Sequence, residues 1–274
     1  GEYEKAIADY DKVIQLSPKD PKAFSNRAVA HFKSGELDNA VADYTQAIRL
    51  NPKYAKAYYS RGAAYAQKRL TEKAIADYDE AIRLEPKNVD AYVGRAQARS
   101  ARADRDGAVD DLTKAIEIKP ESTKAYYNRG VVYGLMGRHE SAIADYSKVI
   151  ELKPDDAKAH CHRGVIYTKR GELDTAVGDF TRAIELDAEY ARAYYNRGLV
   201  HDSAEARRRD RRLQRCHPAQ PRLRRGLPEP GHGLRQEGRQ GPGQTGLPQG
   251  ETTQGRGPIG HPRPRTLPSP ASGD

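Results

Sequence analysis

The sequence contains very little cysteine and no long apolar run. Cys161 and Cys216 are its two cysteines, too few to staple a fold with disulfides, and they favour a reducing compartment. No apolar stretch approaches the roughly 18 residues that a membrane-spanning helix needs. No secretory signal is visible either, although the N-terminus at Gly1 reads as truncated. We therefore expect a protein without membrane contact and favour the cytoplasm.

Patterns that identify catalytic sites are also missing. The sequence has no glycine-rich phosphate loop, no paired-carboxylate motif and no nucleophile elbow. We therefore expect that the protein is not an enzyme and has no cofactor.

Aromatic residues are confined to one part of the chain. Tryptophan is absent, and all 17 tyrosines and three phenylalanines precede residue 200. Residues 201–274 instead hold 14 arginines, no lysine, 7 acidic residues, 11 of the 17 prolines and 12 of the 24 glycines. Most of the formal net charge of +9 therefore lies in this second part. The chain joins two segments of different character.

The first 200 residues repeat with a period of 34. Prolines recur at this step, and four further columns of alanine, aspartate, aromatic residue and arginine keep it. The columns are Pro18, Pro52, Pro86, Pro120 and Pro154; Ala6, Ala40, Ala74, Ala108, Ala142 and Ala176; Asp9, Asp43, Asp77, Asp111, Asp145 and Asp179; Tyr10, Tyr44, Tyr78, Leu112, Tyr146 and Phe180; and Arg27, Arg61, Arg95, Arg129, Arg163 and Arg197. Such self-similarity is the signature of a repeat architecture.

Each unit is predicted to contain two helices. Within residues 123–156, small and apolar residues recur at three- and four-residue spacing in both halves. Gly137 falls between the halves, where a helix end can use a left-handed residue. Pro154 ends the second helix, because proline lacks an amide donor and restricts the residue before it. One hairpin cannot bury its apolar face alone, so we expect stacked neighbours to share a continuous core.

These units resemble tetratricopeptide repeats, the 34-residue helix–turn–helix family. One unit shows the small–aromatic–small–proline pattern at Tyr58, Gly62, Tyr65, Ala74, Tyr78, Ala81 and Pro86. The Asn-Arg-Gly runs at 128–130 and 196–198 resemble a bacterial subtype. The resemblance implies an all-α, right-handed solenoid over residues 1–203. It would comprise half repeats at 1–20 and 191–203 and full repeats at 21–54, 55–88, 89–122, 123–156 and 157–190.

The arginine column lies where the family usually has leucine. Arginine is rarely buried without a charged partner, and the aspartate column is equally regular. A guanidinium group also forms two-pronged contacts with a carboxylate. We therefore predict an internal Arg–Asp ladder that orients neighbouring helices, rather than an anion-binding surface.

The resemblance further implies that the first helix of each repeat lines a concave groove. Tyrosine, asparagine and histidine in this groove would suit an extended or helical peptide, and cations along its edge favour an acidic partner. The alternative is a solvated face without a defined ligand. The candidate partner-binding residues are Lys22, Asn26, Lys56, Tyr59, Lys124, Tyr127, Asn128, Lys158, His162, Arg192, Tyr195 and Asn196.

Three adjacent residues, His160, Cys161 and His162, are candidates for a metal site. Consecutive helical residues point about 100° apart, and only residues three or four apart share a face. The three side chains therefore cannot converge on one ion, and we expect no metal. His160 is predicted to replace an aromatic residue of its column, while Cys161 and His162 face the groove.

Residues 204–274 are predicted to form a disordered Arg-, Gly- and Pro-rich tail. We interpret this tail as repeat sequence read in the wrong frame, because the repeat stops near Ser203 and lysine disappears at the same point. Shifting the frame by one base lets Arg209 to Leu223 be read as Ala-Ile-Ala-Asp-Tyr-Asn-Ala-Ala-Ile-Arg-Leu-Asn-Pro-Asp-Tyr. That reading is in register with the repeats.

The expected function is that of a protein–protein interaction scaffold with a protein or peptide partner. One alternative is an accessory repeat segment of a larger enzyme or transport system. Another is nucleic-acid binding through the basic tail, which is disfavoured because the repeats are nearly neutral. The oligomeric state stays open.

Overall fold

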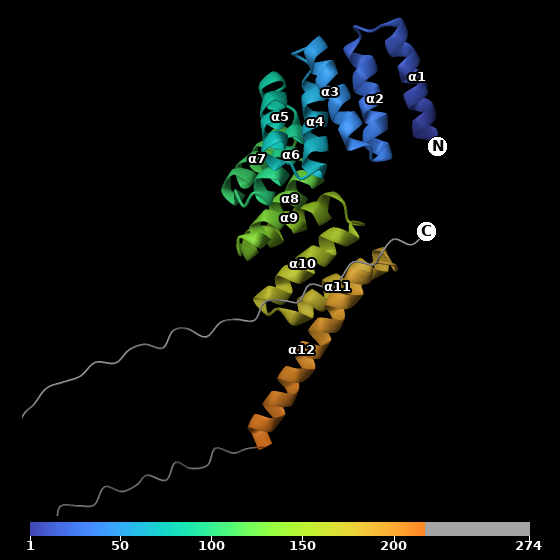
Figure 1. Cartoon of the computed structure of the whole chain (residues 1–274). Coiled ribbons are helices and arrows are strands. Elements are labelled where there is room, and N and C mark those ends of the chain that lie inside the picture. Colours follow the sequence, from blue (N-terminus) through green and yellow to red (C-terminus); the bar gives the residue numbers. More distant parts are fainter. Residues whose placement is uncertain (217–274) are drawn as a thin grey trace, which may run out of the picture. The chain divides into compact units, whose positions relative to one another are not determined.

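The computed structural model describes the backbone of residues 1–216 and the side chains of residues 1–203 and 205. These residues form twelve α-helices and no strand (Figure 1). The predicted all-α solenoid is therefore confirmed, whereas the tail from residue 217 onward lies outside the described residues. The helices are α1 (Glu2–Leu16), α2 (Pro21–Ser34), α3 (Leu37–Leu50), α4 (Ala55–Gln67), α5 (Thr71–Leu84), α6 (Val89–Ala101), α7 (Arg105–Ile118), α8 (Thr123–Leu135), α9 (His139–Leu152), α10 (Ala157–Arg170), α11 (Leu173–Leu186) and α12 (Ala191–Cys216).

The helices pair into hairpins in which an even-numbered helix packs on the odd-numbered helix that follows it. Each expected full repeat contains one such hairpin, from α2–α3 to α10–α11. Within the described part of the chain, α1 is an odd-type helix without an even partner, and α12 is an even-type helix without an odd partner. The two ends of the array are therefore half-hairpins of opposite kind.

Local chemistry sets the helix ends. The side chain of Asp156 caps α10 by accepting a hydrogen bond from the amide of Ala159 at 3.0 Å, which satisfies a backbone donor that the helix leaves free. Pro21 occupies the first turn of α2, where its missing amide costs nothing. Turns within hairpins need a left-handed residue, supplied by Gly35, Gly137 and Gly171.

Small residues let the two helices of a hairpin approach closely. A Cβ atom added at Gly62 would lie 3.1 Å from the ring of Tyr78. The same addition at Gly164 would lie 2.8 Å from the ring of Phe180. The corresponding position holds buried alanine in other repeats, as at Ala96. Each aromatic residue of the odd helix thus fills a notch that only glycine or alanine leaves open.

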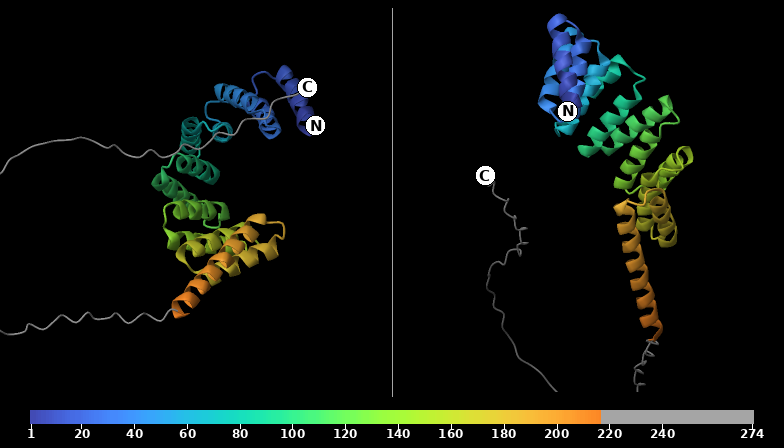
Figure 2. Two further views of the ribbon diagram at one scale, coloured as in Figure 1. Left: turned by 60° about the horizontal axis from the view of Figure 1, so that its bottom comes forward. Right: turned by 90° about the vertical axis from the view of Figure 1, so that its right-hand side faces the viewer.

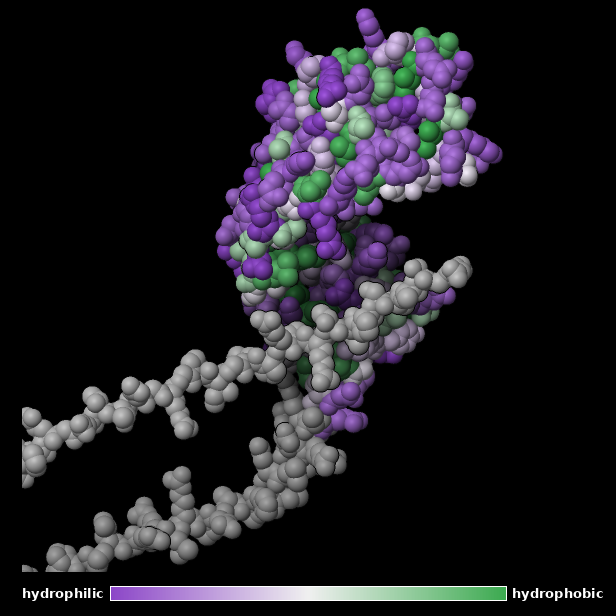
Figure 3. All heavy atoms as spheres, in the orientation of Figure 1, coloured by the Kyte–Doolittle hydropathy of each residue, from purple (hydrophilic) through white to green (hydrophobic). Residues whose placement is uncertain are grey.

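The even-numbered helices form the inner side of a curved stack (Figure 2). Successive even-numbered helices contact one another, whereas no two odd-numbered helices do so within the described residues. Neighbouring elements lie closest on the concave side of a curved array, so this side belongs to the even-numbered helices. The array is visibly hollowed, and polar side chains dominate its visible surface (Figure 3).

The last helix continues past its expected end at residue 203 and reaches Cys216. The segment from Ala204 to His217 contains no glycine or proline, and its arginines, alanines and leucine are good helix formers. Pro218 is the first residue in this region that opposes helix continuation. The average composition of the C-terminal segment had concealed this local difference.

Candidate functional site: the inner face of the even-numbered helices

The predicted Arg–Asp ladder is present. Five arginines on even-numbered helices each grip the aspartate 16 residues later, with Nε and Nη2 donating to the two carboxylate oxygens. Both distances are 2.8 Å for Arg61 and Asp77, and both are 2.9 Å for Arg129 and Asp145. The carboxylates are buried, so each pair fixes the two helices of one hairpin.

A second set of partners was not anticipated. The remaining nitrogen, Nη1, of each arginine donates to the side chain 16 residues earlier, on the odd helix of the preceding hairpin. Each arginine from Arg27 to Arg163 thereby joins three helices. These earlier partners also recur every 34 residues, as Asp11, Thr45, Asp79, Thr113, Ser147 and Thr181. The ladder is internal, and its donors are committed to the fold.

Two ladder aspartates titrate in opposite directions. Burial raises the pKa of Asp145 above its ordinary value despite the hydrogen bonds from Arg129. Burial also acts on Asp179, but hydrogen bonds from Arg163 and His160 outweigh it and leave its pKa lowered. The His160 ring nitrogen Nδ1 lies 3.4 Å from Asp179 Oδ1. An additional donor therefore decides the sign.

The candidate groove residues all lie on even-numbered helices, but they differ in exposure. Lys124 is paired with Asp90 at 2.8 Å, and Asn196 is half-buried with its amide 3.8 Å from the Cys161 sulfur. Tyr195 is 67% exposed. The remaining exposed candidates are Lys22, Asn26, Lys56, Lys158 and Arg192.

Tyr59 and Tyr127 serve the core as well as the groove. Both side chains are half-buried. The ring of Tyr59 lies 5.9 Å from that of Tyr78, and the ring of Tyr127 lies 5.8 Å from that of Tyr146 in an edge-on arrangement. Such pairs contribute to packing, so replacing these two tyrosines would disturb the fold together with the surface.

His162 lies between Tyr127 and Arg192. The Tyr127 hydroxyl is 3.3 Å from both ring nitrogens, and Arg192 Nη1 is 3.4 Å from Nε2. Burial, together with the charge of Arg192, lowers the pKa of His162 to about 4. The ring is therefore neutral at pH 7 and adds no positive charge to the groove.

Cys161 is a correction to the sequence prediction, because it is fully buried and does not face the groove. It packs in the core with Phe180 and Val200. His160 is buried beside Asp179, as a replacement for the aromatic residue of its column, while His162 contacts Tyr127. The three side chains thus enter three different surroundings. Within the described residues, no group of three or more ligating side chains could hold a metal ion.

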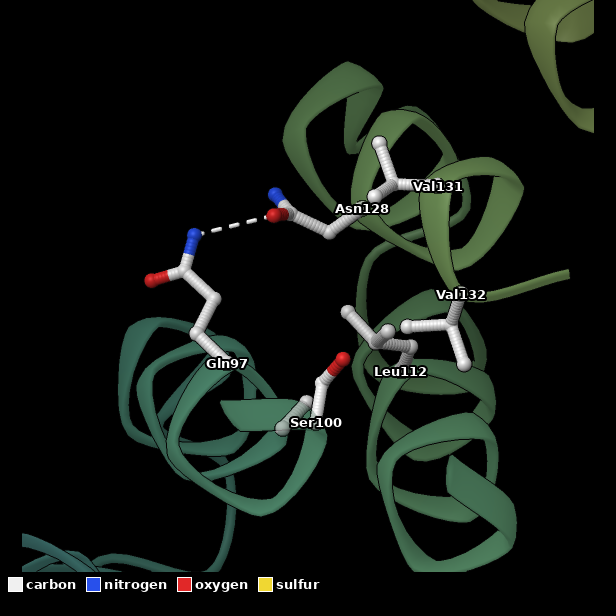
Figure 4. Close-up of a pocket in the computed structure, with 7 residues that line it drawn as sticks. Gln97, Ser100, Leu112, Asn128, Val131 and Val132 are labelled. Carbon is white, nitrogen blue, oxygen red and sulfur yellow. Dashed lines mark hydrogen bonds between the residues drawn. The ribbon is translucent and has the colours of Figure 1, made fainter. Parts of the chain in front are cut away.

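A cavity of about 130 Å³ opens between α6, α7 and α8 (Figure 4). Leu112, Val131 and Val132 give it an apolar lining, and two amides lie at its edge. Asn128 Oδ1 accepts a hydrogen bond from Gln97 Nε2 at 2.9 Å, and Asn128 Nδ2 donates to the Lys124 carbonyl at 2.7 Å. The amide of Asn128 is thus engaged within the protein.

Family comparisons match most of the helical region. A model described as "TPR repeat" matches residues 1–35, 30–68 and 164–202, and one described as "Tetratricopeptide repeat" matches residues 55–88 and 123–156. No curated protein matches the chain in sequence. No helix within the described residues combines the length and apolar character needed to cross a membrane.

Solved structures share the architecture. A tetratricopeptide repeat protein from Parabacteroides merdae is 26% identical, with a TM-score of 0.57 over 73% of this chain and 78% of that one. MamA is 28% identical, with a TM-score of 0.55 over 60% of this chain and 96% of its own. YrrB, described as a TPR protein with an unusual peptide-binding site, is 24% identical, with a TM-score of 0.55 over 68% of this chain and 96% of its own. At that identity, the likeness to YrrB shows the fold alone.

Proposed function

Because the chain belongs to the tetratricopeptide repeat family, a family of protein-interaction scaffolds, we propose that it binds an acidic peptide along the inner face of its even-numbered helices. The observation that carries this proposal is an array of exposed cations at one register of those helices. Lys22, Lys56, Lys158 and Arg192 are separated by multiples of 34 residues. Within the described residues, none of these four forms an ion pair.

Cations on the odd-numbered helices behave differently. Lys114 is paired with Glu117 at 2.8 Å, and Arg182 is paired with Glu185 at 2.9 Å. Arg83 and Lys148 likewise have glutamate partners three residues away. The outer helices thus neutralise their cations locally, whereas the inner helices leave four uncompensated. An acidic partner would gain from long-range attraction to the inner side only.

The inner face also offers apolar contact. A cavity of about 110 Å³ beside α8 and α10 is lined by Val131, Leu135, Tyr146 and His162, with Arg192 at its edge. A second cavity of about 160 Å³ has Tyr127, Asn128 and Lys158 in its wall. A peptide that alternates acidic and aliphatic side chains would meet both kinds of surface. The neutral His162 suits the aliphatic part.

Binding can be tested with a fluorescein-labelled decapeptide of alternating glutamate and leucine, followed by fluorescence anisotropy. We expect the double variant Lys158→Gln/Arg192→Gln to weaken binding about tenfold and to reduce its salt dependence, because two rim charges are lost. The matched control is Lys114→Gln/Arg182→Gln, which removes two cations from odd-numbered helices and should bind normally. Equal affinity of the two double variants would overturn the proposal. The basic tail on which nucleic-acid binding would depend lies outside the described residues.

A further inference from the structure

The final described helix exposes a face that every complete hairpin covers. Tyr194 is 45% exposed and Leu199 is 47% exposed. No atom of the described structure lies within 4 Å of a Cβ added at Gly198. At the equivalent Gly62, Gly130 and Gly164, such an atom would meet an aromatic ring of the odd helix. The notch on α12 is therefore built but empty among the described residues.

Arg197 is poised on the same face. Its Nη1 donates to Thr181 at 3.1 Å, as the ladder requires. In the five preceding repeats, the Nε–Nη2 edge grips an aspartate 16 residues later, but position 213 is Leu213. Within the described residues, this edge of Arg197 has no carboxylate partner. It lies beside the open notch at Gly198.

The first helix carries the complementary set. In α1, Ala6, Asp9 and Tyr10 occupy the alanine, aspartate and aromatic columns of the odd helices. The helix already packs on α2 through one side, where Asp11 accepts from Arg27. Its other side remains open: Asp9 is exposed, Tyr3 is 46% exposed, and the helix has no buried residue.

We infer that α1 of one molecule packs against α12 of a second molecule and completes its hairpin. The ladder spacing puts Asp9 of the second molecule on the Nε–Nη2 edge of Arg197, and Tyr10 of the second molecule in the notch at Gly198. Charge and shape therefore match in one register. The two surfaces differ, so the contact is heterologous and leaves a free end on each molecule. This inference is independent of what binds the inner face.

Sedimentation velocity on the full chain over a range of concentrations tests this contact. The unmodified chain should form an open-ended series of oligomers. Asp9→Arg disables the α1 end and Arg197→Asp disables the α12 end, so each variant alone should need at least about tenfold higher concentration to associate. A mixture of the two variants retains one intact pair of ends. It should form dimers that grow no further.

A second pair of variants separates assembly from folding. Gly198→Leu should block the notch for Tyr10 of the second molecule and abolish association, while its unfolding midpoint at low concentration stays unchanged. Gly178→Leu on α11 adds the same side chain at another position where a Cβ meets no atom within 4 Å, and it should associate normally. A chain that stays monomeric at all concentrations would overturn the inference, as would an Arg197→Asp variant that still dimerises by itself.

Discussion

Single residues decide both the joints of this array and its response to acid. His162 occupies a column whose other members are Asn26, Ser60, Gly94, Asn128 and Asn196, none of which titrates in the acid range. Its pKa is lowered from 6.5 to about 4. Between these values the unfolded chain takes up a proton that the folded chain does not, so stability is highest above pH 6.5 and falls as the pH drops towards 4.

We expect His162→Asn to remove part of the acid sensitivity of the fold. The histidine contributes a loss of at most about 3 kcal/mol between pH 7 and pH 4, from about 1.4 kcal/mol per unit of pKa difference. Urea unfolding midpoints at pH 7.5 and pH 4.5 measure the effect. The drop between the two pH values should be smaller in the variant, and identical drops would contradict this account.

The columns also show which contacts could be predicted from sequence. The Arg–Asp pairs could be foreseen because both columns keep one residue type throughout the described repeats. The second set of arginine partners was missed because their column alternates among aspartate, threonine and serine, which share only an acceptor oxygen. Cys161 was misplaced for a related reason. Its column mixes the half-buried Tyr127 with the fully buried Val93, and side-chain size decides which of these reach the surface.

Among the elements, the turns within hairpins show the clearest local conflict. Five turns use the same position, which holds glycine at Gly35, Gly137 and Gly171. The other two place Arg69 and Ala103 in the left-handed region, at φ of 59° and 66°. A residue with a Cβ there costs about 1–2 kcal/mol. This strain was not visible in the helical periodicity, which predicts helices but not the backbone angles between them.

Arg69→Gly and Ala103→Gly should each stabilise the protein by about 0.5–1 kcal/mol. Relief of the left-handed strain outweighs the extra freedom that glycine gives the unfolded chain, about 0.4–1 kcal/mol. Urea denaturation measures the change. The reciprocal control is Gly137→Ala, where φ is 73° and no atom lies within 4 Å of the added Cβ, so backbone strain alone should destabilise it. Destabilisation by both glycine substitutions would refute the argument.

Across the whole molecule, stability should follow the number of neighbours. Local stability in stacked repeats depends on adjacent units, and residues 55–156 have a complete hairpin on each side. We expect the slowest amide exchange there and faster exchange in α1 and α12. Hydrogen exchange read out by mass spectrometry at low protein concentration, where molecules do not cover each other's ends, tests this gradient. Uniform protection along residues 1–203 would contradict it.

The two reaches of each arginine also fix the unit in which this protein can change length. Losing residues 89–122 would bring Arg129 within reach of Asp79, the acceptor that Arg95 uses now, so the new joint would copy one that already exists. Gain of a whole repeat preserves the joints by the same rule. An insertion or loss of any other length would set guanidinium and carboxylate out of step at the junction. Recombination between repeats of the same gene can therefore lengthen or shorten the array without requiring a new interface.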